Sequence, residues 1–358
     1  MAQDGNAPHR DASPPAAADL YEPLRVLMRR FGATCSPREF YWAVNHAFHA
    51  AAAEGYDHML RDMFVPLWDV WARLLRHLPP VDARPQLRFL DVGCGTGLVG
   101  DILTRLCANR VEELTLLDPS APMLAQCRRK SAAWPFPCRF LEGDLSAAPD
   151  HPAFDVITMD SVLHHVVELE AFLRRASDLL DPGGLILTAQ DERAESTEDS
   201  VFLSRRAGAG AARPLVRRML RRARNAIRAA ARRLGYYRQV PLAAATNEVL
   251  LRGGTIRRRM DLDSINAVTD YHITGQPGRL GRGIKLAQLQ DWLPGVDRMD
   301  YFTYAFHGRT WSRLTEEQRR QEEAWLSQGD PHGQTFASAW RKPPAWNHSA
   351  GCARRAPC

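Results

Sequence analysis

The feature that most constrains this chain is the segment from Arg88 to Gly100, RFLDVGCGTGLVG. Its apolar start is typical of a buried strand, and the LVGDILTRLC that follows the glycines has the pattern of a helix. The glycines between them predict a tight turn, because glycine adopts backbone angles closed to other residues and lets main-chain amides approach a ligand. A strand, a glycine turn and a helix begin a doubly wound α/β sheet, and the helix start presents unpaired N–H groups to a polar ligand. We therefore expect an α/β fold with a ligand site at this turn.

The spacing of the glycines disfavours a dinucleotide site. In the dinucleotide fingerprint the third glycine falls where this chain has Leu98, one residue after Gly97. Asp91, at the end of the predicted strand, would also place a carboxylate close to a bound pyrophosphate. A carboxylate at that position suits a cationic amine instead.

Other acidic residues follow further predicted strands. Asp118 ends the apolar run 114–117 and lies 21 residues after Gly97, the spacing at which an acidic residue meets ribose hydroxyls. Asp144 closes the predicted strand 138–146, and Asp160 with Ser161 follows the buried run FDVITM. Ligands of open α/β sheets bind outside the carboxyl ends of the strands, so these side chains are expected around one site.

The motifs D-V-G-C-G-T-G, D-P-S-x-x-M and L-x-P-G-G resemble those of the class I S-adenosylmethionine (SAM)-dependent methyltransferases, small-molecule type. The resemblance implies a Rossmann-like doubly wound sheet, mostly parallel with an antiparallel last strand, and transfer of the sulfonium methyl group to O or N of a small metabolite. It implies that Asp91 and the glycine loop hold the methionine part of SAM, Asp118 the ribose and Asp144 the adenine. The full set of cofactor residues it implies is Tyr56, Asp91, Gly93, Cys94, Gly95, Gly97, Asp118, Pro119, Met123, Asp144, Leu145, Asp160 and Ser161.

The resemblance covers the chain from about residue 20 to residue 343 as one domain. We expect residues 1–19 and 344–358 to be disordered, residues 20–80 to form helices that cover the cofactor, and residues 192–284 to form a helical lid inserted into the domain. Thr315 and Gln318 fit a capping box that opens a helix, between two strands that finish the sheet.

The first half of the insertion is strongly basic, with twelve arginines and no acid from Arg205 to Arg238. A solvated face of a lid helix accounts for this pattern, and so does a site for an anionic substrate or carrier. Aromatic residues are nearly absent from the segment, which disfavours stacking of single-stranded nucleic acid. The chain also lacks the (Asp/Asn)-Pro-Pro-aromatic sequence of many base methylases, so nucleic acid is disfavoured as the substrate.

His164, Tyr271 and His272 are the candidate catalytic residues. A histidine can take the proton from an acceptor as the methyl group transfers, and the two lid residues can orient the acceptor if the lid closes. His164 can equally pack against the cofactor, because transfer from a sulfonium often needs only alignment. No metal site is expected, since the histidines lack ligand-like spacing with Cys, Asp or Glu.

The composition of the chain limits where the protein is expected to reside and what it is expected to bind. No run approaches 18 uncharged apolar residues, the N-terminus lacks the basic-then-apolar order of a signal peptide, and the seven cysteines have no regular spacing. We expect a cytoplasmic enzyme with a small-molecule substrate; the sequence allows an anionic acceptor and a homo-oligomer. Two alternatives remain open here. In one, SAM is itself the substrate and is cleaved or cyclised to give methylthioadenosine. In the other, the chain is a non-catalytic subunit that holds RNA or a partner through its Arg-rich helix.

Overall fold

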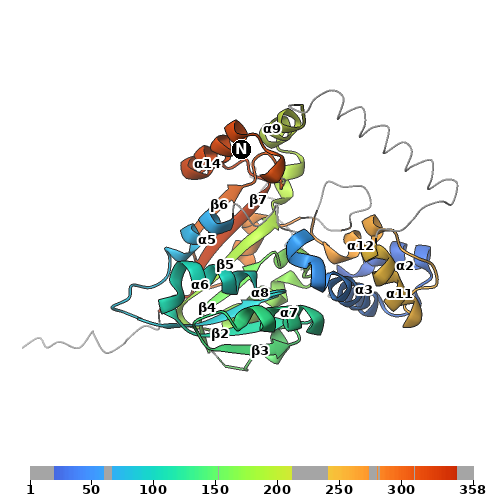
Figure 1. Cartoon of the computed structure of the whole chain (residues 1–358), viewed down its shortest axis with the longest axis horizontal. Helices are drawn as coiled ribbons and strands as arrows, with labels where there is room; N and C mark the ends of the chain where they lie inside the picture. Colours follow the sequence, from blue (N-terminus) through green and yellow to red (C-terminus); the bar gives the residue numbers. More distant parts are fainter. Residues whose placement is uncertain are drawn as a thin grey trace, which may run out of the picture.

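The computed structural model describes residues 20–59, 67–151, 153–211, 241–273, 280, 283–309 and 311–344, and these are built around one seven-stranded sheet (Figure 1). The strands are β1 Leu87–Val92, β2 Val111–Asp118, β3 Cys138–Glu142, β4 Phe154–Asp160, β5 Leu180–Glu192, β6 Asp297–Tyr304 and β7 Thr335–Arg341. Their order across the sheet is β3-β2-β1-β4-β5-β7-β6, and β7 pairs antiparallel with both of its neighbours. The expected mostly parallel sheet with an antiparallel last strand is confirmed.

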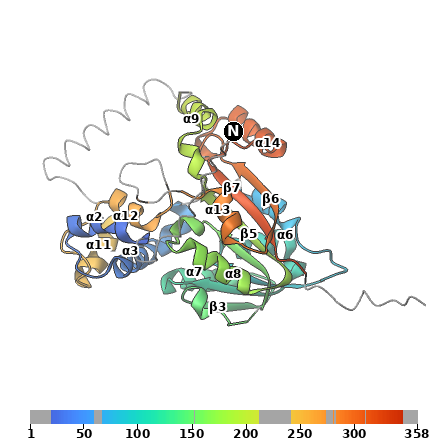
Figure 2. The same ribbon diagram turned by 180° about the vertical axis from the view of Figure 1, so that it is seen from behind.

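Helices cover both faces of the sheet, which is why its central strands are almost continuously apolar. α5 (Leu67–Leu75), α6 (Leu98–Cys107) and α7 (Ala121–Ser131) pack on one face, and α8 (Leu169–Asp178) and α13 (Leu286–Trp292) on the other (Figures 1 and 2). The chain leaves β1 toward β2 and β3 on one side and returns to β4 and β5 on the other. This reversal opens a crevice at the carboxyl ends of β1 and β4, the usual ligand site of such sheets.

A second group of helices forms its own layer beside the sheet (Figures 1 and 2). It contains η1 (Glu22–Leu24), α2 (Arg25–Phe31), α3 (Pro37–Ala52), η2 (Ala53–Gly55), α11 (Pro241–Arg252) and α12 (Leu262–Thr269). These helices share a core that includes Leu24, Phe40, Val44, Leu250 and Ile265, all nearly inaccessible to solvent. Helices from the start of the described chain and from residues 241–269 therefore fold as one unit, which we call the roof.

The described parts of the insertion expected at residues 192–284 do not lie together. Its two ends meet in a bridge between Arg193 and Ile284, next to the end of β5. α9 (Ser200–Ala211) lies beside α14 (Glu316–Gln328), far from the roof, where Arg205 pairs with Asp330 at 2.7 Å (Figure 1). Only α11 and α12 join the roof, so the described parts of the insertion go to two different places.

Several expectations concern the ends of elements or undescribed segments. Thr315 and Gln318 form the expected capping box at the start of α14. Residues 1–19, most of the C-terminal tail and the Arg-rich segment 212–240 lie outside the described residues. The remaining short helices are η3 Ala108–Arg110, η4 Leu145–Ala147, η5 Leu163–His165, η6 Ala194–Thr197 and η7 Trp311–Arg313. Within the described ranges, no helix has the length and apolarity needed to cross a membrane.

Candidate functional site

A pocket lies at the carboxyl ends of β1, β2, β4 and β5, beneath α3 of the roof. It encloses ≈ 1180 Å³ that protein atoms do not fill, counted out to the solvent at its mouth. Every residue that the sequence predicts for cofactor binding lines this pocket, with the exception of Gly97. The sheet therefore brings together residues from five separate segments of the chain.

The glycine loop is held by the carboxylate of Asp118. One oxygen of Asp118 accepts from the amide of Gly95 at 2.8 Å, and the other accepts from the amide of Ser120 at 2.8 Å. Gly93 and Gly95 have φ values of 64° and 52°, and a Cβ on Gly93 would lie 2.7 Å from Val162. Glycine is required at Gly93 both for its backbone angle and for this close approach.

Gly97 has a different role from the one expected. It is the N-cap of α6 with φ 92°, and a Cβ there would meet Trp134 and Cys127 at 2.8 and 2.9 Å. Gly97 therefore permits close packing of α6 and does not line the pocket.

Asp91 presents an unpaired carboxylate oxygen deep in the pocket. Its side chain is 1% exposed, and Oδ1 accepts from the Thr158 hydroxyl at 2.8 Å. Oδ2 is buried and has no hydrogen-bond partner among the described residues. Burial is the main cause that raises the pKa of Asp91 well above its ordinary value, and the nearby carboxylates of Asp160 and Asp118 add to it. A buried acceptor without a partner is costly, so this atom is suited to a cationic donor on a ligand.

Asp160 and its neighbours form a strained edge of the pocket. Asp160 accepts from the indole of Trp71 at 2.9 Å and from the amide of Gln190 at 2.8 Å, and burial raises its pKa to about 7. Ser161 and Gln190, at the ends of β4 and β5, have φ values of 62° and 68°. Such angles are unfavourable for residues other than glycine and gather at functional sites.

The opposite end of the pocket suits an aromatic ring. Met123 and Leu145 supply buried apolar surface, and Pro119 lies beside them on the lining. The Asp144 carboxylate accepts from the amide of Ser146 at 2.9 Å, and this bond lowers its pKa. Asp144 is exposed, so its other oxygen can also accept from a ligand.

The roof contributes a row of side chains that the sequence analysis missed. Tyr41, Trp42, Asn45, His46 and His49 of α3 line the pocket. Three of them repeat every four residues, at positions 41, 45 and 49, so they share one face of the helix. The sequence signal that could have revealed these residues is a helix face that packs inward and yet carries polar groups.

Tyr56 also lines the pocket, as expected, and burial raises its pKa. Nearby, Asp57 accepts from the Thr96 hydroxyl at 2.5 Å. This contact ties the segment that follows η2 to the glycine loop.

His164 is buried behind the pocket wall and does not line the pocket. Its backbone N–H and its Nδ1 lie 3.0 and 2.8 Å from the same oxygen of Asp191. The neighbouring His165 does line the pocket, and its Nδ1 lies 2.6 Å from the carbonyl oxygen of Thr269. Of the two histidines, His165 is therefore the one in reach of a ligand.

Tyr271 and His272 are placed away from the pocket. The Tyr271 hydroxyl donates to the carbonyl of Leu20, and His272 Nε2 lies 2.9 Å from the carbonyl of Val166. The His272 amide also donates to the carbonyl of His164 at 2.9 Å. His272 fastens the roof to the loop after β4, and Tyr271 joins two segments of the roof. The expectation of catalysis did not include these structural roles.

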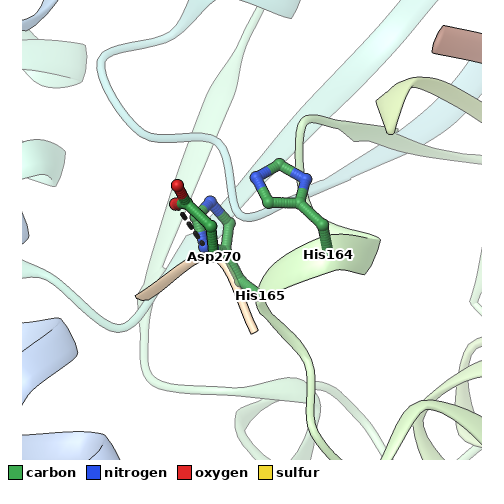
Figure 3. Close-up of side chains that lie close together, drawn as sticks. All are labelled: His164, His165 and Asp270. Carbon is green, nitrogen blue, oxygen red and sulfur yellow. Dashed lines mark ion pairs between the residues drawn. The ribbon is translucent and has the colours of Figure 1, made fainter. Parts of the chain in front are cut away.

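The structure places an acidic side chain next to two histidines that are distant from it in the sequence. Asp270, at the end of α12, lies beside His164 and His165 (Figure 3). The spacing along the sequence could not reveal this cluster, because the roof folds back over the loop that follows β4.

The pocket as a whole fits a ligand with a cationic end, hydroxyl groups and an aromatic ring. Asp91 suits the cation, Asp118 and the Ser120 hydroxyl suit the hydroxyls, and Asp144 with Met123 suits the ring. The Ser120 hydroxyl is a second buried polar atom without a partner in the described part of the chain.

Comparisons with known proteins find similarity to methyltransferases. Residues 90–186 match the family model described as a methyltransferase domain. Ubiquinone biosynthesis O-methyltransferases are similar over this region: that of Bradyrhizobium sp. (strain ORS 278) is 32% identical over 114 residues, which are 32% of this chain and 44% of the relative. That of Rhodopseudomonas palustris (strain HaA2) is 31% identical over 103 residues, 29% of this chain and 39% of the relative. The match thus spans less than half of either relative.

Among solved structures, an S-adenosylmethionine dependent methyltransferase from Mesorhizobium loti aligns with 76% of this chain and 96% of its own, at 16% identity and a TM-score of 0.40.

Proposed function

We propose that the protein is a class I SAM-dependent methyltransferase that transfers the methyl group of SAM to an oxygen or nitrogen of a small metabolite. The match of residues 90–186 to the methyltransferase-domain family model supports the proposal. The observation that carries the proposal is the arrangement of Asp91, Asp118 and Asp144, which lie at or just beyond the carboxyl ends of β1, β2 and β3 around one pocket. The O-methyltransferase names of the similar proteins favour oxygen as the acceptor atom.

The residues of the pocket fit SAM. The unpaired Oδ2 of Asp91 would accept from the α-ammonium group, and Asp118 would accept from the ribose hydroxyls while it holds the glycine loop. Asp144 would accept from the adenine amino group, with Met123 against the ring. SAM, when bound, supplies a methyl group already activated on a sulfonium.

The protein's own contribution is then position and the exclusion of water. The acceptor would lie between the sheet edge at Ser161 and the roof residues His46 and His49. Aligning two reactants in this way lowers the barrier without an acid or a base, because the entropy of association has already been lost. His164, the candidate base, lies behind the wall, so alignment is the better supported mechanism.

The test is to incubate the purified protein with SAM alone and then with a panel of hydroxyl- and amine-bearing metabolites, following nucleoside products by mass spectrometry. Formation of S-adenosylhomocysteine that depends on one acceptor, and that is lost in an Asp91→Asn variant, is the expected result. Methylthioadenosine formed from SAM alone would instead identify SAM as the substrate and overturn the proposal. A protein that does not bind SAM but binds RNA with a steep salt dependence would point to the non-catalytic alternative.

Three narrower assignments belong to the same proposal. A cytoplasmic location is supported by five free cysteines among the described residues, Cys35, Cys94, Cys107, Cys127 and Cys138. An anionic acceptor is supported by the Arg-rich sequence 205–238, most of which lies outside the described residues. A homo-oligomer remains compatible with the sequence, and size-exclusion chromatography with light scattering decides it.

A further inference from the structure

Two carboxylates from neighbouring strands lie at the end of the pocket that fits the methionine part of SAM. Asp91 belongs to β1 and Asp160 is the last residue of β4, and the two strands pair in parallel with Asp91 beside Thr158. Both carboxylates line the pocket, and none of the described residues that line it is a lysine or an arginine. Burial raises the pKa of Asp91, and the charge of Asp160 adds to this effect, so the two groups lie within electrostatic reach of each other.

Asp160 differs from Asp91 in how its oxygens are used. Its Oδ1 accepts from the indole of Trp71 at 2.9 Å, and its Oδ2 accepts from the side-chain amide of Gln190 at 2.8 Å. Both donors are neutral, so they fix the orientation of the carboxylate without cancelling its charge. The guanidinium of Arg309 donates to the Gln190 carbonyl oxygen from outside the pocket lining. Asp160 therefore offers a ligand an oriented negative charge, whereas Asp91 offers an oxygen that lacks a donor.

The methionine end of SAM carries two positive charges of different chemistry. Its α-ammonium group has N–H donors and needs a free acceptor, which Asp91 Oδ2 provides. Its sulfonium has no N–H group, so a protein recognises it through charge. A carboxylate whose oxygens already have donors, such as that of Asp160, can still supply this attraction. S-adenosylhomocysteine keeps the ammonium group, but its sulfur is a neutral thioether.

We propose that Asp160 makes the pocket selective for SAM over S-adenosylhomocysteine, through attraction between its carboxylate and the sulfonium charge. This inference rests on the proposed function, because it assigns a role within the SAM site. Asp91 would hold the two ligands alike, since both carry the ammonium group. A pocket that reads the charge on sulfur binds the methyl donor in preference to the spent product, and this limits inhibition as product accumulates.

The ionisation of Asp160 gives a second way to vary the same charge. Burial raises its pKa to about 7 and Asp191 adds to this, while its two neutral donors and the charge of Arg309 act in the opposite direction. Tyr56 and Tyr304 also face Asp160, and burial raises the pKa of each, so both stay neutral near pH 7. Affinity for the sulfonium should therefore rise with pH around neutrality, and affinity for the neutral thioether should not follow it. Ionisation of Asp91 affects both ligands, so it largely cancels from their ratio.

The test is titration calorimetry of the full-length protein with three commercial ligands, SAM, S-adenosylhomocysteine and sinefungin. Sinefungin carries a cationic amine on carbon in place of the sulfonium, so it keeps a positive charge there without the S-methyl group. The variant is Asp160→Asn, which is nearly isosteric, and the Gln190 amide can turn so that its oxygen accepts from the new NH2 group. Asp144→Asn is the matched control, because it removes a carboxylate from the adenine end, which all three ligands share. Wild-type protein and Asp160→Asn are compared at pH 6 and pH 7.5, and thermal unfolding checks that each variant is folded.

We expect Asp160→Asn to lower the ratio of SAM affinity to S-adenosylhomocysteine affinity by about ten-fold or more at pH 7.5. Sinefungin should lose affinity as SAM does, and Asp144→Asn should weaken all three ligands to a similar extent. The ratio should rise from pH 6 to pH 7.5 in the wild-type protein and stay level in Asp160→Asn.

Equal losses of SAM and S-adenosylhomocysteine in Asp160→Asn would overturn the inference alone, because a purely structural role of Asp160 gives that result. Sinefungin that behaves like S-adenosylhomocysteine would also overturn it, since the pocket would then read the methyl group and not the charge. A ratio that still rises with pH in Asp160→Asn would assign the effect to another group, such as Asp191, and contradict the proposal. If Asp160→Asn does not fold, the wild-type pH series decides, and a level ratio overturns the inference. If none of the three ligands binds the wild-type protein, the proposed function falls and the inference falls with it.

Discussion

Replacing Asp91 by Asn should weaken SAM binding while leaving the fold intact or more stable. Removing one partner of a buried, hydrogen-bonded charge pair costs about 2–5 kcal/mol, so the affinity for SAM should fall about 30- to 4,000-fold. In the free protein the same carboxylate is 1% exposed and one of its oxygens has no partner in the described chain. An amide at this position removes the cost of burying that charge, and the Thr158 hydroxyl can still donate to its oxygen.

The dependence on pH gives this prediction a sign that can be checked. The pKa of Asp91 is raised in the folded protein, so its neutral form is favoured there. The wild-type protein should therefore lose stability as the pH rises from the unfolded pKa through the folded one, and the variant should not show this contribution. SAM pairs with the ionised form, so the wild-type affinity for SAM should rise over the same range.

Titration calorimetry with SAM at pH 8 and urea unfolding at pH 5 and pH 8 measure both effects. Asp178→Asn, at an exposed aspartate that does not line the pocket, is the control for loss of a carboxylate. A variant at Asp91 that binds SAM within three-fold of the wild-type protein would refute the role of this carboxylate. A loss of stability that matches the loss of affinity would refute the account of its unpaired charge.

Three further predictions follow from the packing. Tyr271→Phe should leave kcat unchanged and lower the free energy of unfolding by about 0.5–1.5 kcal/mol, since the bond to Leu20 is lost; a large fall in kcat would restore its catalytic role. Gly100→Ala should destabilise the protein by about 1–3 kcal/mol, because the new Cβ would lie 2.2 Å from Trp134. Adding Trp134→Leu should recover part of that loss of stability. Strict additivity of the two changes in the free energy of urea unfolding would contradict this prediction. Asp160→Asn should flatten the fall in the free energy of unfolding between pH 5 and pH 8. The pKa of Asp160 is raised to about 7 in the folded protein, so ionisation of Asp160 disfavours the fold in that range. Parallel plots of stability against pH for the wild-type protein and the variant would argue against this prediction.

The sheet and the cofactor end of the pocket could be predicted because their signals are local. Glycines at 93 and 95 are demanded by backbone angles of the turn itself, and Asp118 is the last residue of its strand. The carboxyl ends of parallel strands meet by geometry, so residues far apart in sequence could be placed together without knowledge of side-chain packing.

The roof could not be predicted in the same way. Its helices α3 and α12 come from distant parts of the chain, and their contact depends on the shared core. Asp270 reaches His165 only through that contact, which is why the sequence did not reveal their proximity. Gly97 was predicted to bind the cofactor and Tyr271 to take part in catalysis, yet both residues serve packing. Glycine and tyrosine occur in both kinds of role, so the local sequence could not tell a structural residue from a functional one.

The position of β7 between β5 and β6 has a consequence for synthesis of the protein. β5 is complete at Glu192, but the strand that covers its outer edge begins only at Thr335, about 140 residues later. At ribosomal rates of about 5–20 residues per second, the edge of β5 stays uncovered for roughly 7 to 30 seconds after it is made. An uncovered, largely apolar strand edge is a template for pairing with other chains. Nascent chains of this protein should therefore depend on chaperones until translation is nearly finished, and shortening the chain before β7 should cause aggregation more readily than it causes a loss of SAM affinity.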